Sequence, residues 1–311
     1  MLRLGLCCKF FEEPIAFRTT TVAALSRAPR AQQLAKLSQL ARANAESLRL
    51  ALAYCAANGI GCFRVNSQIL PVKTHHGAGY AVSDLPDAEA IISAFKACGR
   101  FARAHGLRLT FHPDQFILLS ATDPEIIRKS LLDLDYQAEV AAWVGADVIN
   151  IHAGGAYGDK PAALARLADA LRSLPQAVRA RLTLENDDRV YTPADLLPLC
   201  RETGTPLVYD VHHHRCLPDG LSIGEATAQA LATWDREPLV HVSSPKDGPG
   251  CKNPGPHHDF IDPADFPGEW GSLNLTVEVE AKAKEVAVKR LRRALEKKNV
   301  PLWPGAPLRE T

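Results

Sequence analysis

The 311-residue sequence lacks any apolar run near the roughly 20 residues that cross a bilayer, and residues 1–5 pass directly into structured-looking chain rather than a signal peptide. It also lacks a CxxC pair among its eight cysteines, which argues against a cysteine zinc site and against a disulfide framework. The formal net charge is only +1, so any affinity for nucleic acid must come from a local patch. These absences predict a cytoplasmic protein without membrane contact.

Short β-rich segments alternate with helical segments along the whole chain, a pattern typical of βα units around a parallel sheet. The expected strands are residues 2–6, 60–65, 107–111, 148–151, 182–184, 206–209, 239–242 and 274–279. The expected helices are residues 31–57, 87–105, 124–144, 160–173, 193–203, 222–234 and 282–297. Eight units fit a closed (β/α)8 TIM barrel better than an open doubly wound sheet. We therefore predict one TIM-barrel domain over residues 1–311, with a long functional loop at residues 243–271.

Ionisable side chains stand at the ends of six consecutive expected strands, and the carboxyl ends of barrel strands form the active-site rim. In chain order they are His112, His152, Glu185, Asp210, His241 and Glu280. Any one of them alone is more often a satisfied core residue. Six in register are costly to desolvate together unless cations compensate them, so they predict a metal site.

Imidazole mixed with carboxylate favours Mn²⁺ or Zn²⁺ over Ca²⁺. The ligand supply exceeds what one ion needs, because His75, His257 and His258 lie in neighbouring loops. We expect two or three divalent ions, Mn²⁺ first, with Zn²⁺ or Mg²⁺ as alternatives. Such clusters suit phosphodiester hydrolysis, since closely spaced cations generate hydroxide, neutralise phosphate and stabilise the leaving alkoxide.

An ordered set of motifs resembles the ultraviolet-damage endonucleases, which share a barrel and metal cluster with endonuclease IV. The motifs are Arg3-Leu4-Gly5, Phe63-Arg64-Val65, His112-Pro113-Asp114-Gln115-Phe116, His152-Ala153-Gly154-Gly155, Leu184-Glu185-Asn186-Asp187, Asp210-Val211-His212-His213, His241, Pro256-His257-His258-Asp259 and Val279-Glu280-Ala281-Lys282. The resemblance implies metal ligands at His75, His112, His152, Glu185, Asp210, His213, His241, His257 and Glu280. Among these, Glu185 would bridge two ions, and we expect Glu185, His112, His152, Asp210 and Glu280 to carry catalysis.

The family's Asp-x-x-His spacing is present at Asp210 and His213, and it would let one loop supply two neighbouring ions. Of the three consecutive histidines, only His213 fits this register. His212 and His214 are interpreted as supporting or surface groups.

Two positions depart from the family pattern. Where relatives carry a Gln-Tyr pair that fills the space opposite flipped-out damaged bases, this chain has Gln115 and Phe116. Phe116 can stack where the bases leave the helix or pack under its own loop. Many relatives also carry a lysine, carboxylated and joined to the metals, where this chain has Leu239. Either a third ion binds less firmly, or another group such as Lys246 or Asp259 replaces that lysine.

Further DNA contacts are expected around the rim. Gly154, Gly155 and Tyr157 would let the backbone pass close to DNA, although a plain turn fits the same residues. The candidates for phosphate contacts are Lys246, Lys252, Lys282 and Lys284.

The resemblance implies a monomeric endonuclease that nicks double-stranded DNA 5′ to UV photoproducts and leaves a 3′-hydroxyl and a 5′-phosphate. One alternative is a sugar isomerase or epimerase of the xylose-isomerase-like barrels, which also carry carboxylates and histidine around a divalent ion. The additional histidines argue against it, because isomerases usually need one or two ions. A second alternative is a non-catalytic lesion-binding protein that uses its metals structurally.

Overall fold

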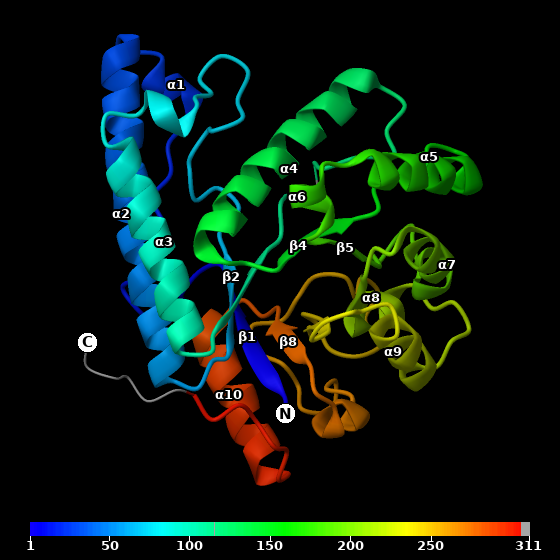
Figure 1. The fold of residues 1–311 in the computed structure, drawn as a ribbon. Helices are drawn as coiled ribbons and strands as arrows, with labels where there is room; N and C mark the ends of the chain where they lie inside the picture. Colours follow the sequence, from blue (N-terminus) through cyan, green and yellow to red (C-terminus); the bar gives the residue numbers. More distant parts are fainter. Residues whose placement is uncertain (115, 306–311) are drawn as a thin grey trace.

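The computed structural model describes residues 1–114 and 116–305 and contains a closed barrel of eight parallel strands in chain order (Figure 1). The strands are β1 (Arg3–Cys7), β2 (Cys62–Val65), β3 (Arg108–Phe111), β4 (Val148–His152), β5 (Leu182–Glu185), β6 (Leu207–Asp210), β7 (Leu239–Val242) and β8 (Thr276–Val279). The barrel closes where β8 pairs with β1, with Val277 opposite Leu4. The predicted TIM barrel and its eight strands are confirmed.

Helices cover the outside of the barrel, and α2 and α3 lie side by side on one flank (Figure 1). The helices are α1 (Val22–Leu25), α2 (Arg30–Ala57), α3 (Ala88–Ala104), α4 (Pro124–Val144), α5 (Lys160–Ser173), α6 (Gln176–Arg179), α7 (Pro193–Thr203), α8 (Val211–Cys216), α9 (Ile223–Leu231) and α10 (Lys284–Lys297). Two 3₁₀ helices, η1 (Val82–Asp84) and η2 (Gly268–Ser272), complete the list. The short helices α1, α6 and α8 were not expected, because fewer than two turns give too little periodicity to read.

Single residues set several helix boundaries. The side chain of Asp123 accepts a hydrogen bond from the amide of Glu125 and starts α4. Gly145 ends the same helix with φ 75°, a left-handed conformation that glycine adopts without strain. Thr192 and Asp195 cap the start of α7 reciprocally. Asp123 and Thr192 therefore fix where the loops after β3 and β5 end, and these loops follow the rim residues His112 and Glu185.

A small apolar cluster of Val148, Val208 and Leu239 is separate from the main core between barrel and helices. Val208 and Leu239 each precede an ionisable residue, Asp210 and His241, by two positions. Side chains two apart on a strand share a face, so this cluster is the apolar floor beneath the polar rim.

Every helix within residues 1–114 and 116–305 is too short or too polar to cross a bilayer.

A glycine sets how closely α3 approaches α4. A Cβ at Gly99 would lie 2.6 Å from the carbonyl oxygen of Val144, a backbone atom that cannot move without its helix. We expect Gly99→Ala to lower the free energy of unfolding by about 1–3 kcal/mol, measured as a shift of the urea midpoint at constant m-value. Gly224→Ala is the matched control, because the nearest atom to its Cβ is 3.9 Å away. Equal destabilisation by both substitutions would contradict this account of the helix packing.

Candidate metal centre

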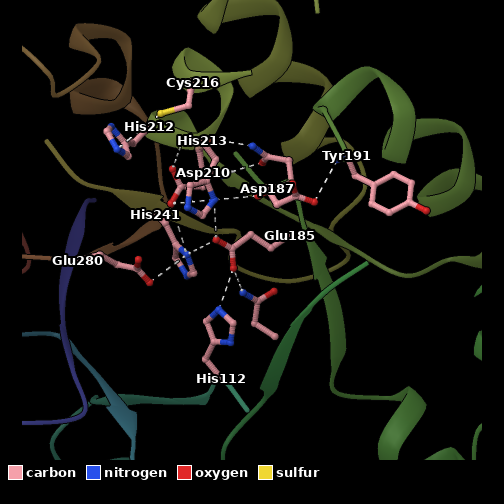
Figure 2. Close-up of polar contacts among 12 residues, drawn as sticks. His112, Glu185, Asp187, Tyr191, Asp210, His212, His213, Cys216, His241 and Glu280 are labelled. Carbon is pink, nitrogen blue, oxygen red and sulfur yellow. Dashed lines mark hydrogen bonds and ion pairs between the residues drawn. The ribbon is translucent and has the colours of Figure 1, made fainter. Parts of the chain in front are cut away.

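Glu185, the last residue of β5, is the centre of the rim and is only 1% exposed. Its Oε2 lies 3.0 Å from His112 Nε2, and its Oε1 lies 3.1 Å from His241 Nδ1 and 3.4 Å from His213 Nδ1. Figure 2 shows these imidazoles approaching the carboxylate from different parts of the chain: His241 from β7, His112 from just after β3, and His213 from α8. A buried carboxylate with histidines on both oxygens is a donor set suited to divalent cations.

Two amides hold the residues around this carboxylate. Asn150 on β4 donates to Glu185 Oε2 at 2.5 Å, and Thr183 in turn donates to the Asn150 side-chain oxygen at 2.9 Å. Asn186 donates to the carbonyl of Asp210 and accepts from its amide, both at 2.9 Å. The strands β5 and β6 are thereby fixed in register at the rim, which limits the movement of Glu185 and Asp210.

The expected Asp-x-x-His loop is a helix. Asp210 is the N-cap of α8, and its Oδ1 accepts from the amide of His213 at 2.8 Å. This cap starts a helix directly after β6, and the first turn of that helix brings His213 Nδ1 to 3.4 Å from Glu185 Oε1. His214 instead contacts Tyr209 and Asp219, and His212 lies beside Cys216. Of the three histidines, His213 is the one that meets the central carboxylate.

Two sets of ligand atoms lie within 4.8 Å of one another in the described part of the chain. One set is His112, His152 and Glu185, and the other is Glu185, Asp210 and His241. His152 Nδ1 and Asp210 Oδ2 are buried and have no hydrogen-bond partner among the described residues. Buried polar atoms without partners are costly, so their presence in these two sets is evidence that the residues fit a pair of cations sharing Glu185.

The charges of this cluster are strongly coupled. Burial opposes the charge of Glu185, but His241 and His152 outweigh the burial and hold the pKa of the carboxyl well below its ordinary value. Burial also opposes protonation of His241 and His213, yet Glu185 raises the pKa of His241 to about 10 and Asp210 raises that of His213 to about 11. Burial lowers the pKa of His152, which keeps its ring neutral. A cation that binds here must therefore displace protons from histidine.

Glu280, just after β8, extends the cluster. Its Oε1 lies 3.5 Å from His241 Nδ1, and its Oε2 lies 3.7 Å from His257 Nδ1. Arg64 on β2 binds Glu280 at 2.6 Å and also pairs with the buried Glu278. Glu280 thus connects two other expected ligands, His241 and His257.

His75 belongs to neither of the two ligand sets. It is exposed, and its Nδ1 accepts from the amide of Gly77 at 3.2 Å. It lines a groove of about 970 Å³ together with Phe116, Arg128 and Lys129. Phe116 is 74% exposed, so the alternative that it packs under its own loop is wrong. Gln115, the other half of the expected pair, lies outside the described residues.

A second pocket, of about 470 Å³, opens beside Glu280 and His257. Its cationic lining includes the predicted phosphate contacts Lys282 and Lys284 together with Lys9. Lys9 was not predicted, because its position in the first loop carries no pattern that points to the rim.

The two groups that were considered as replacements for the family lysine, Lys246 and Asp259, are both exposed. Neither belongs to the two ligand sets, and Leu239 itself lies in the apolar floor. Lys252 is exposed in the same long loop as Lys246.

The turn after β4 is closely packed at its first glycine. A Cβ at Gly154 would meet Ser120 Oγ at 3.0 Å, and the carbonyl of Gly155 accepts from the Tyr191 hydroxyl at 3.2 Å. Tyr157 is 45% exposed beside this turn. Packing within the protein accounts for Gly154, while Tyr157 remains available to a ligand.

Sequence reasoning did not single out Asn150, Thr183, Arg64 and Glu278 as parts of the site. The sequence did contain a signal for three of them, because alternate residues of a β-strand face the same side. Asn150, Thr183 and Glu278 each precede a predicted ligand by two residues and therefore share its face. Arg64 gave no such signal, because its strand ends without a predicted ligand.

The fold and the site define a TIM-barrel protein with a candidate metal centre at the carboxyl ends of its strands. The model of the family described as UV-endonuclease UvdE matches residues 2–302. A UV DNA damage endonuclease of Deinococcus radiodurans is 37% identical over 303 residues, which cover 93% of this chain and 94% of the relative. The chain therefore belongs to the UV-endonuclease family, and the predicted family is confirmed.

Solved structures agree with the fold. The crystal structure of SacUVDE superposes with a TM-score of 0.86 at 24% identity and covers 97% of this chain and 100% of that chain. Endonuclease IV from Thermus thermophilus superposes with a TM-score of 0.61 at 17% identity, covering 95% and 99%. At these identities the likeness concerns the fold alone, and it bears out the barrel shared with endonuclease IV.

The raised histidine pKa values predict how the stability of metal-free protein depends on pH. Stability from His213 and His241 is fully present below their unfolded pKa of about 6.5 and is lost as the pH rises toward their folded values of about 11 and 10. We expect the Tm of EDTA-treated protein to fall between pH 6.5 and 9.5, measured by circular dichroism. His213→Asn should show a smaller fall, because asparagine does not titrate. Burial raises the pKa of the Cys8 and Cys98 thiols to about 11 in both proteins, so their contribution to the fall is the same in each. Equal falls would therefore contradict the assignment to His213.

Proposed function

We propose that this protein is a metal-dependent endonuclease that nicks double-stranded DNA on the 5′ side of UV photoproducts and other helix-distorting lesions. It would leave a 3′-hydroxyl, which a polymerase can extend, and a 5′-phosphate. The observation that carries the proposal is the buried Glu185 carboxylate with His112, His213 and His241 around it. Membership of the UV-endonuclease family supports damaged DNA as the substrate and argues against a sugar isomerase.

The donor atoms fit two divalent ions that share Glu185, and we infer Mn²⁺ as the native cation, with Zn²⁺ or Mg²⁺ as alternatives. Glu280 and His257 offer further donors for a third ion. When bound, closely spaced divalent cations lower the pKa of water, neutralise phosphate charge and stabilise a departing alkoxide.

The side chains have separable tasks in this proposal. Glu185 would bridge the ions, and Asn150 would hold its orientation through the 2.5 Å hydrogen bond. The lysine-lined pocket beside Glu280 would bind backbone phosphates, with Lys282 and Lys284 supplying positive charge. Phe116, exposed at the other groove, would stack where damaged bases leave the helix. Together these groups would hold the scissile phosphodiester against the cluster.

The proposed activity can be tested with supercoiled plasmid, irradiated or not, in the presence of Mn²⁺. We expect nicking confined to irradiated plasmid, loss of nicking with EDTA, and a decrease of more than about 100-fold for Glu185→Gln, because the shared ligand loses its charge. The matched control is Glu237→Gln, since Glu237 pairs with Arg3 outside the cluster.

Other outcomes point to other functions. Retention of irradiated DNA without cleavage would indicate a lesion-binding protein. Indifference to both plasmids would remove DNA nicking as the function and return the sugar isomerase to consideration.

Phe116 tests the recognition of the lesion. We expect Phe116→Ala to weaken binding to a duplex with one photoproduct by about 1–3 kcal/mol, because a base loses its stacking partner. Phe116→Tyr should keep most of the affinity. Leu50→Ala, at an exposed apolar residue of α2, is the control. Fluorescence anisotropy measures all four proteins, and unchanged binding by Phe116→Ala would exclude a stacking role.

A further inference from the structure

A buried arginine stands at the edge of the candidate metal centre. Arg64 faces the site from β2 and is only 7% exposed. Its guanidinium donates to Glu278 Oε2 through Nε at 2.6 Å and pairs with Glu280 Oε1 through Nη1 at 2.6 Å. A guanidinium is permanently charged and only donates, so it cannot be a metal ligand. Its presence beside a cation site requires another role.

The carboxylate of Glu278 gives the first part of that role. Glu278 is 1% exposed, accepts from the Thr110 hydroxyl, and lies with its Oε2 3.1 Å from His241 Nε2. The other ring nitrogen of His241, Nδ1, faces Glu185 at 3.1 Å and Asp210 at 3.9 Å. Nε2 faces both Glu278 Oε2 and Arg64 Nη2, the latter at 2.8 Å, so in the metal-free protein this nitrogen can accept from the guanidinium. When Nδ1 is offered to a cation the proton lies on Nε2, and Glu278 is the carboxylate positioned to accept it.

The second part concerns Glu280. Arg64 engages its Oε1, while its Oε2 faces His257. The same guanidinium therefore ties together the carboxylate that supports His241 and the carboxylate that extends the cluster. Because Arg64 and Thr110 occupy the carboxylate of Glu278, we infer that Glu278 supports the site without being a metal ligand itself.

We propose that Arg64 and Glu278 are positioning residues that set the affinity of the centre for divalent cations: Glu278 fixes the ring of His241 through Nε2, and Arg64 fixes Glu278 and Glu280. The inference rests on the proposed metal-dependent function. It assigns a task to two buried charges that belong to neither of the two ligand sets.

Mn²⁺ binding to the full-length protein, followed by electron paramagnetic resonance of free Mn²⁺, tests the proposal without measuring activity. We expect Glu278→Gln to raise the Kd by about 10–100-fold, the range typical of groups that orient a ligand. Arg64→Lys should also weaken binding, because one ammonium cannot hold both carboxylates in the fork geometry of a guanidinium. The control is Arg108→Lys, which alters an ion pair with Asp147 at the opposite, amino end of β3.

Thermal unfolding of each metal-free variant separates positioning from loss of the fold. If a single variant does not fold, the double variant Arg64→Met with Glu278→Met removes both buried charges, and we expect it to fold and to bind Mn²⁺ weakly. If a single or double variant folds and binds Mn²⁺ with wild-type affinity, the positioning role is overturned but the metal centre is not. Absence of Mn²⁺ binding by the wild type would overturn the proposed metal centre, and the positioning role with it.

Discussion

The buried charge of Glu185 is the constraint on which the rest of the site depends. A carboxylate inside a barrel is unfavourable unless neighbouring groups compensate it, and here the compensation comes from His112, His213 and His241. These partners follow or belong to β3, α8 and β7, so only a closed barrel brings them to one point. The apolar floor below and the ring of imidazoles around it leave a polar cluster that suits cations.

Support for the ligands follows one pattern around the rim. Asn150 holds Glu185, Asn186 holds the backbone of Asp210, and the pair of Arg64 and Glu278 holds His241 and Glu280. In each case a buried polar group binds a candidate ligand residue and restricts its rotation. The site is therefore built from two layers of polar residues: an inner layer of candidate metal ligands and an outer layer that holds those ligands in place.

Two surfaces flank the cluster and differ in chemistry. The pocket beside Glu280 is lined by lysines, whereas the groove beside Phe116 has an exposed aromatic ring with charges of both signs. Phosphate neutralisation and base stacking are different physical tasks, and in the proposed function each falls to a different one of these surfaces. Family membership agrees with such a division, since an endonuclease specific for damage must both hold the backbone and sense the bases.

The alternation of strands and helices predicted eight βα units from the sequence alone, because a period of two and a period near 3.6 are local properties of the chain. The same alternation placed His112, His152, Glu185, Asp210 and His241 at one rim. Tertiary structure decided what depends on orientation across the barrel. It converted the residues after Asp210 into a helix and brought Arg64 and Glu278 together from strands far apart in sequence. No local pattern specifies such contacts, because they exist only when the barrel closes.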